Sequence, residues 1–185
     1  VLVEGNVIDR VSDTCIAADG ADRVIVGNLC SRAGGQGIAL NQVRQTCIGN
    51  ICKNNGQLSS VPAANKAGIR LFGVNADHCL VEGNVCYDDQ GTKTQEYGIS
   101  VASGDTNNRI SGNNLNGNNT AGILDSGSSN TVRENEGYVT ENSGTATVLN
   151  GATTVVVNHG LAATPTRVLL TARTWGNAAK ASVGT

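Results

Sequence analysis

Apolar and polar residues alternate along most of the chain, in short runs separated by turn residues. The pattern repeats around the dipeptide Gly-Asn, with an apolar residue three positions before each asparagine and, in all but the last copy, another two positions after it. Alternation with a period of two predicts β-strands, and Gly-Asn predicts a tight turn between them. The asparagines of this dipeptide, with Glu134-Asn135 as its degenerate copy, are Asn6, Asn28, Asn50, Asn84, Asn113 and Asn135.

A second dipeptide, Gly-Ile, recurs between these asparagines. It occurs at Gly37, Gly68, Gly98 and Gly122, with Cys15-Ile16 as the variant first copy. The asparagine spacings of 22, 22, 34, 29 and 22 give a base period of 22 residues, and most of the extra length falls before the Gly-Ile segment. Three short strands per period predict one coil of a parallel β-solenoid, in which equivalent side chains stack in columns. We therefore expect about five to six coils over residues 1–137, with the asparagines stacked as a ladder.

The repeat also resembles a known fold family. The segments V-E-G-N-V-I (Val3–Ile8), I-V-G-N-L-C (Ile25–Cys30) and V-E-G-N-V-C (Val81–Cys86), with the Gly-Ile series, resemble the right-handed parallel β-helix of the pectate-lyase-like superfamily. The resemblance covers residues 1–137 and implies an all-β fold. A leucine-rich repeat of similar period is excluded because its regular leucines and helical segments are absent. The family does not specify a reaction, because this fold hosts many chemistries.

Residues 138–185 break the period and form a second predicted unit. Three segments rich in valine and threonine read as strands, separated by turns at Asn150-Gly151 and His159-Gly160. The motif V-x-V-N-H-G-L-x-x-x-P at Val155–Pro165 resembles the small β-sandwich that follows β-helices in phage tail-spike-like proteins. We expect an incomplete C-terminal β module of this kind, in a piece of a longer protein.

Composition and charge exclude several classes of protein. Glycine is abundant, with 24 residues, and aromatic residues make up 3% of the chain, which disfavours a helical bundle or coiled coil. The net charge of −2 gives no electrostatic reason to expect a nucleic-acid partner. No apolar run approaches the roughly 20 residues of a membrane-spanning helix, so no membrane insertion is expected.

Five of the six cysteines fall on the inward-facing phase of the repeat. Cys30, Cys52 and Cys86 occupy the same position in successive coils, and Cys47 and Cys79 also face inward. Free cysteine packs like a small hydrophobic residue, so we predict buried thiols. Disulfide formation is the alternative, whereas a metal site is not expected because no Cys-x-x-Cys pair is present.

The family resemblance implies a ligand groove on the outer face of the Gly-Ile strands. Two long insertions, residues 54–65 and 88–96, precede this strand in adjacent coils and are expected to rise beside the groove. An aromatic ring and a guanidinium together suit a sugar that carries a carboxylate. The expected substrate-binding residues are Arg70, Phe72 and Tyr97, grouped on the groove floor, with Gln36, Asn41 and Asp19.

Candidate catalytic groups are acidic residues at the second insertion, namely Asp88, Asp89 and Glu96. Glycosidases use two carboxylates, and polysaccharide lyases use a base near a neutralised uronate. No cofactor is predicted, although Ca²⁺ on these carboxylates is the ion that a lyase would use. The residues leave open whether the chain is an enzyme, because packing and solvation explain the same acids.

Two classes of function remain from the sequence. One is a polysaccharide-binding, or polysaccharide-degrading, β-helix of a viral tail-spike or cell-surface protein. The other contains the alternatives to it. They are a non-catalytic structural fibre or adhesin, and a secreted polysaccharide lyase, hydrolase or epimerase. The tail-spike resemblance implies a glycan partner, a virion-surface or extracellular location and a homotrimer, since the short C-terminal module needs a partner surface.

Overall fold

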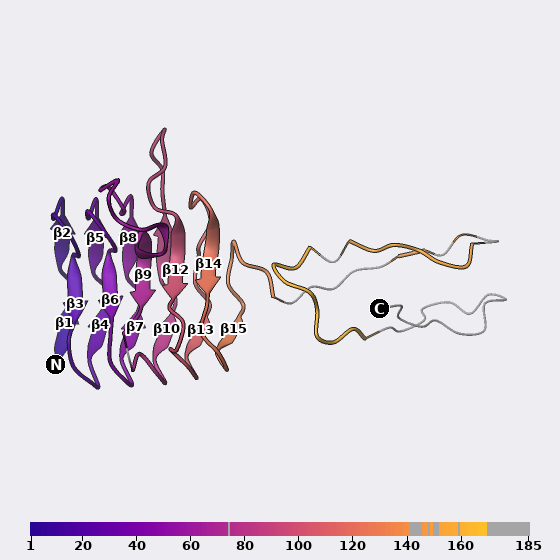
Figure 1. The fold of residues 1–185 in the computed structure, drawn as a ribbon, viewed down its shortest axis with the longest axis horizontal. Helices are drawn as coiled ribbons and strands as arrows, with labels where there is room; N and C mark the ends of the chain where they lie inside the picture. The colour runs from indigo at the N-terminus through magenta and orange to yellow at the C-terminus, as the bar shows by residue number, and fades with distance from the viewer. Residues whose placement is uncertain (74, 141–145, 148, 150–151, 159, 170–185) are drawn as a thin grey trace.

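The computed structural model describes residues 1–73, 75–140, 146–147, 149, 152–158 and 160–169. Its described residues contain fifteen short strands and one 3₁₀ turn, η1 (Ala63–Asn65). The strands form three parallel sheets that extend along the axis of a solenoid (Figure 1). This is the arrangement of a parallel β-helix, as the period predicts.

Each coil contributes one strand to each sheet, until sheet B ends at the fourth coil. Sheet A contains β1 (Leu2–Glu4), β4 (Val24–Val26), β7 (Thr46–Ile48), β10 (Leu80–Glu82), β13 (Arg109–Ser111) and β15 (Thr131–Arg133). Sheet B contains β2 (Val7–Asp9), β5 (Leu29–Ser31), β8 (Ile51–Lys53) and β11 (Val85–Tyr87). Sheet C contains β3 (Ile16–Ala18), β6 (Ile38–Leu40), β9 (Ala67–Leu71), β12 (Tyr97–Val101) and β14 (Ala121–Asp125).

The predicted asparagine ladder forms at the turn between sheets A and B. The backbone N–H of each asparagine but the last donates to the Oδ1 of the asparagine in the next coil, at 2.9–3.1 Å. From Asn28 onward, each Nδ2 donates to a main-chain carbonyl of the preceding coil. Asparagine suits this position because its side chain carries both a donor and an acceptor. The residue before it is left-handed, with φ of +64° at Gly83 and +55° at Glu134.

The core consists of columns of inward-facing side chains from the three sheets. Cys30, Cys52 and Cys86 are in register on neighbouring strands of sheet B and are fully buried, which confirms the predicted stack. All six cysteines are free thiols. Burial raises the pKa of the Cys79 thiol to about 11, and raises that of Cys47 well above its usual range. These two thiols therefore stay protonated and unreactive at neutral pH.

The Gly-Ile series has a steric cause at the corner between sheets B and C. A Cβ placed on Gly68 would lie 2.8 Å from Cys86 Cβ and 2.8 Å from the carbonyl oxygen of Gly98. Gly98 is similarly confined, because its Cβ would lie 2.8 Å from the carbonyl oxygen of Gly122. Only glycine allows successive coils to approach this closely while the next residue, isoleucine, enters the core.

A second buried polar ladder crosses this corner, and the sequence period did not reveal it. Asn55 Oδ1 accepts from the Ala33 N–H at 3.0 Å, and Asn55 Nδ2 donates to Gln95 Oε1 at 2.9 Å. Gln95 Nε2 in turn donates to Asn118 Oδ1 at 2.8 Å. Asn55 and Gln95 are fully buried, so these bonds satisfy polar groups that water does not reach.

The C-terminal part is described only in segments. Strand β15 is the last strand among the described residues, and an isolated antiparallel bridge joins Asn135 and Tyr138. Among the described residues beyond position 140, none belongs to a strand or helix. The end of the third predicted strand, residues 170–173, lies outside the described residues, and the β-sandwich module stays a prediction.

Candidate functional site

The outer face of sheet C carries a row of side chains in register across the coils. Ala39 of β6 lies beside Arg70 of β9, and Arg70 lies beside Ser100 of β12. The adjacent residues Ile69 and Leu71 are fully buried in the core, so Arg70 points outward. Because both row neighbours have small side chains, the guanidinium group has room beside it on the face of the sheet.

Arg70 and Phe72 contact each other directly. The guanidinium carbon lies 4.4 Å from the centroid of the Phe72 ring, which is cation–π geometry. Arg70 Nε and Ser100 Oγ are both buried and have no hydrogen-bond partner. Buried polar groups are nearly always paired in native proteins, so these two unpaired atoms, both closed to solvent, are a departure from that rule.

The charge of Arg70 is not neutralised by an ion pair with any described residue. Burial lowers the pKa of its guanidinium, and the charge of Asp105 partly opposes this shift. Asp105 is itself buried, which raises the pKa of its carboxyl group. Arginine titrates far above neutral pH, so Arg70 is a half-buried cation that is available to an anionic ligand.

Asp19 and Asn41 extend the same face toward the first coil. Leu40 and Leu71 are paired in register. The residues that follow them, Asn41 and Phe72, therefore lie beside each other. Asn41 Nδ2 donates to Asp19 Oδ1, and Asn41 Oδ1 is buried without a partner. The structure therefore brings together four of the six expected binding residues.

Tyr97 and Gln36 depart from the expectation. Tyr97 is in register with Ala67, three positions before the Arg70–Ser100 pair, which corresponds to about 10 Å along the strand. The two insertions lead into this same end of sheet C, since residues 54–65 precede Ala67 at the start of β9 and residues 88–96 precede Tyr97 at the start of β12. The expected grouping of Tyr97 with Arg70 and Phe72 beneath the insertions is thus corrected. Gln36 has only 7% of its surface exposed, so it does not line the outer face.

Asp88 stabilises the second insertion from within. Its Oδ1 accepts from the Gln90 N–H at 2.9 Å, and its Oδ2 accepts from the N–H groups of Thr94 and Gln95 at 2.7 and 2.8 Å. The residue is 3% exposed. A buried carboxylate with main-chain donors on both oxygens is a loop cap, and it is not placed to act on a substrate.

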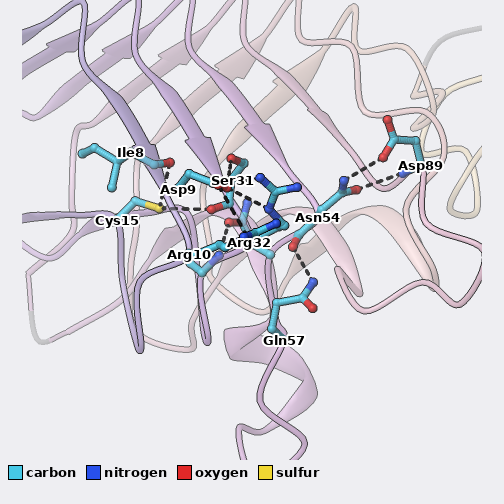
Figure 2. A network of polar contacts seen from close by, with 11 residues as sticks. Ile8, Asp9, Arg10, Cys15, Ser31, Arg32, Asn54, Gln57 and Asp89 are labelled. Carbon is cyan, nitrogen blue, oxygen red and sulfur yellow. Dashed lines mark hydrogen bonds and ion pairs between the residues drawn. The ribbon is translucent and has the colours of Figure 1, made fainter.

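Asp89 and Glu96 bond to different coils. Asp89 and Asn54 exchange two hydrogen bonds, of 2.7 and 3.0 Å, as Figure 2 shows. Glu96 Oε2 instead accepts from Asn119 Nδ2 at 2.9 Å and from the hydroxyl of Thr120, both in the following coil. The bonds of these two carboxylates therefore point in opposite directions along the solenoid.

An ion-pair cluster occupies the corner between sheets B and C in the first two coils (Figure 2). Arg32 binds Asp9 with both Nε and Nη2, at 2.9 and 2.5 Å, and Ser31 donates to the same carboxylate at 2.6 Å. These hydrogen bonds, chiefly those from Arg32, lower the pKa of Asp9 to about 2. The cluster links the first coil to the second through charged hydrogen bonds, and the sequence pattern did not identify it.

Comparison with known proteins gives no relative for this chain. A scan against protein-family models matched no family, and searches of curated proteins and of solved structures matched no protein. Within the described residues, no helix is long and apolar enough to span a membrane. In the same residues, no group of three or more histidine, cysteine or acidic side chains is arranged to hold a metal ion.

Proposed function

We propose that this protein binds a polysaccharide with acidic sugar units on the outer face of sheet C, centred on Arg70 and Phe72. The proposal rests on one observation: a half-buried guanidinium, held 4.4 Å from an aromatic ring, has no ion-pair partner among the described residues. A sugar carboxylate would pair with the guanidinium, and the sugar ring would lie on Phe72.

The surroundings of Arg70 suit a linear polymer. Two adjacent rows cross successive coils here, one with Asp19, Asn41 and Phe72 and the other with Ala39, Arg70 and Ser100. Neighbouring sugar units would therefore meet neighbouring coils. Amide and carboxylate groups at one end can bond sugar hydroxyls, while Phe72 offers an apolar surface to the sugar ring.

Binding without cleavage is favoured over an enzymatic function. Asp88 is a buried loop cap, and Asp89 and Glu96 hold separate coils. These residues also belong to the insertion that leads into the start of β12, whereas Arg70 and Phe72 lie near the end of β9. The resemblance of the C-terminal region to tail-spike proteins supports a location on a virion or cell surface. The same proposal includes a right-handed β-helix and a C-terminal β-sandwich module.

Alanine substitution at the site tests the binding proposal. On an array of neutral, uronate-containing and sialylated glycans, the protein is expected to retain acidic glycans. Arg70→Ala is expected to weaken that binding by about tenfold or more, because one charge-assisted hydrogen-bonding group is lost. Phe72→Ala is expected to weaken it by a smaller factor, since it removes the stacking surface and the support of the guanidinium.

Arg109→Ala is the matched control, because this arginine is exposed on the opposite sheet A and should leave glycan affinity unchanged. Product analysis of the bound glycan should show no new chain ends. Unchanged affinity in Arg70→Ala, or binding of neutral glycans alone, would remove the basis for the site.

A second candidate, a non-catalytic fibre, is favoured by apolar side chains that sheets A and B expose. Leu2 and Val24 of sheet A are 57% and 39% exposed, and Val7 and Ile51 of sheet B are 74% and 40% exposed. The two faces meet at the Gly-Asn turn. In a homotrimer, sheet A of one copy can pack on sheet B of the next and leave sheet C free for the glycan.

Light scattering tests this assembly, with an expected mass of about three times the chain mass of 18.9 kDa. Combining Val24→Asp with Ile51→Asp should give monomers, whereas Arg70→Ala, on the free sheet C, should not change the mass. A monomeric mass for the unmodified chain would exclude the trimer and leave the glycan site untouched.

A further inference from the structure

Cys15 stands where the following coils have glycine. The equivalent residues are Gly37, Gly68, Gly98 and Gly122, each directly before the inward-facing isoleucine of sheet C. A side chain at this position would point at the sheet B column of the next coil. A Cβ on Gly37 would lie 3.3 Å from Cys52 Cβ, and one on Gly68 would lie 2.8 Å from Cys86 Cβ.

The same relation directs Cys15 at Cys30. The proximity of the two thiols raises the pKa of Cys15 and lowers that of Cys30 to about 5. Cys15 Sγ also lies 3.8 Å from the carbonyl oxygen of Ile8, the register partner of Cys30, and 4.0 Å from that of Ser31. Figure 2 shows Cys15 between Ile8 and Ser31, beside the Asp9–Arg32 ion pair. Cys30 is fully buried and Cys15 is half-buried, so Cys15 is the member of the pair that a reagent reaches first.

We propose that Cys15 and Cys30 form a site of oxidative modification, where a peroxide or a disulfide reagent joins them into a disulfide that links the first coil to the second. The Cβ separation that a disulfide needs is about 3.5–4.5 Å. The distances at the equivalent glycines are slightly shorter than this range, so a small outward shift at the exposed first coil brings the pair into it.

The other stacked cysteines do not have this geometry. Cys30, Cys52 and Cys86 are in register on neighbouring parallel strands, with side chains pointing the same way. Their Cβ atoms are therefore separated by about the strand spacing of 4.8 Å, which exceeds the disulfide range. The column stays reduced while the Cys15–Cys30 pair reacts.

The reaction balances with hydrogen peroxide as the oxidant. The thiolate that the pair forms in alkaline buffer attacks one peroxide oxygen and becomes a sulfenic acid, releasing hydroxide. The sulfur of the other cysteine then attacks this sulfur, the S–OH bond breaks, and the departing hydroxide takes the proton of the second thiol as water. In total, two thiols and one peroxide give one disulfide and two waters.

The disulfide would close a loop of 16 residues, from position 15 to position 30, and link the first coil to the second. Val7 in the first coil is 74% exposed, and its strand β2 pairs with β5 of the second coil. A crosslink restricts the unfolded chain, so oxidation is expected to stabilise the first coil against fraying.

Peptide mass spectrometry after treatment with hydrogen peroxide in mildly alkaline buffer tests the site. The expected product is a peptide pair joined through Cys15 and Cys30, with the other four thiols unmodified and the crosslink reversed by dithiothreitol. Oxidation should also raise the Tm by roughly 5–10 °C.

Cys15→Gly is the matched variant, because it restores the residue of the other coils and should fold normally. It should show neither the crosslink nor the rise in Tm on oxidation. Cys79→Ser should keep both, because Cys79 lies in a different column. Overoxidation of Cys15 without a crosslink, a disulfide between two chains, or a Tm rise that persists in Cys15→Gly would each overturn the proposal.

Discussion

Replacing Asn84 with alanine is expected to lower the free energy of unfolding by about 4 kcal/mol, since it breaks the asparagine ladder at its centre. Asn84 is fully buried. Its Oδ1 accepts from the N–H and Nδ2 of Asn50, at 2.9 and 3.0 Å, and its Nδ2 donates to the carbonyl oxygen of Cys47 at 2.9 Å. Alanine leaves the Asn50 N–H buried without a partner, which costs about 1–3 kcal/mol, and removes one of the bonds to the Cys47 carbonyl.

Urea denaturation measures this loss, with Asn6→Ala as the matched control. Asn6 holds the same position in the first coil but is exposed, so water can replace its bonds and the loss should stay below about 1 kcal/mol. Equal losses in the two variants would show that the ladder adds nothing beyond the turn itself.

Gly68→Ala is expected to lower the free energy of unfolding by about 3 kcal/mol, through overpacking at the corner between sheets B and C. The new Cβ would lie 2.8 Å from both Cys86 Cβ and the carbonyl oxygen of Gly98. Cys86 belongs to β11, which pairs with β8, and Gly98 belongs to β12, which pairs with β9 and β14. Relief of the clash therefore requires movement of one of these paired strands.

Two other glycines separate this steric effect from backbone preference. Gly83→Ala meets no atom within 4 Å but has a φ of +64°, so a loss of about 1–2 kcal/mol is expected from the left-handed conformation alone. Gly91 has neither constraint, and its alanine variant should match the unmodified chain. Urea midpoints that do not follow the order Gly68, Gly83, Gly91 would contradict this account.

The sequence was sufficient for the features that recur with the coil. The stack from Asn6 to Asn135 and the column of Cys30, Cys52 and Cys86 follow from the period and from strand alternation. Strand pleat and strand spacing leave little freedom, because a residue at a given position in one coil must face its equivalent in the next.

Features that depend on the unequal insertions were not predictable. Asn55 meets Gln95, 40 residues away, and Gln95 meets Asn118, 23 residues away, so the second ladder has no constant period. From the sequence, Asp88 is expected to be an exposed acid in a loop. In the structure, main-chain N–H groups of its own insertion donate to its carboxylate. Such partners are set by the path of a loop, which alternation does not describe.

Some features of the candidate site could be predicted from the sequence, and others depend on the tertiary structure. Sequence alone determined that Arg70 and Phe72 face outward on the Gly-Ile strand, because every second residue of a strand points to the same face. Only the tertiary structure decided that Tyr97 lies about 10 Å away along the strand, that Gln36 is buried, and that Cys15 lies against the Ile8 and Ser31 carbonyls beside Cys30. Register and the approach of adjacent coils fix these relations, and both arise from packing between residues that are distant along the chain.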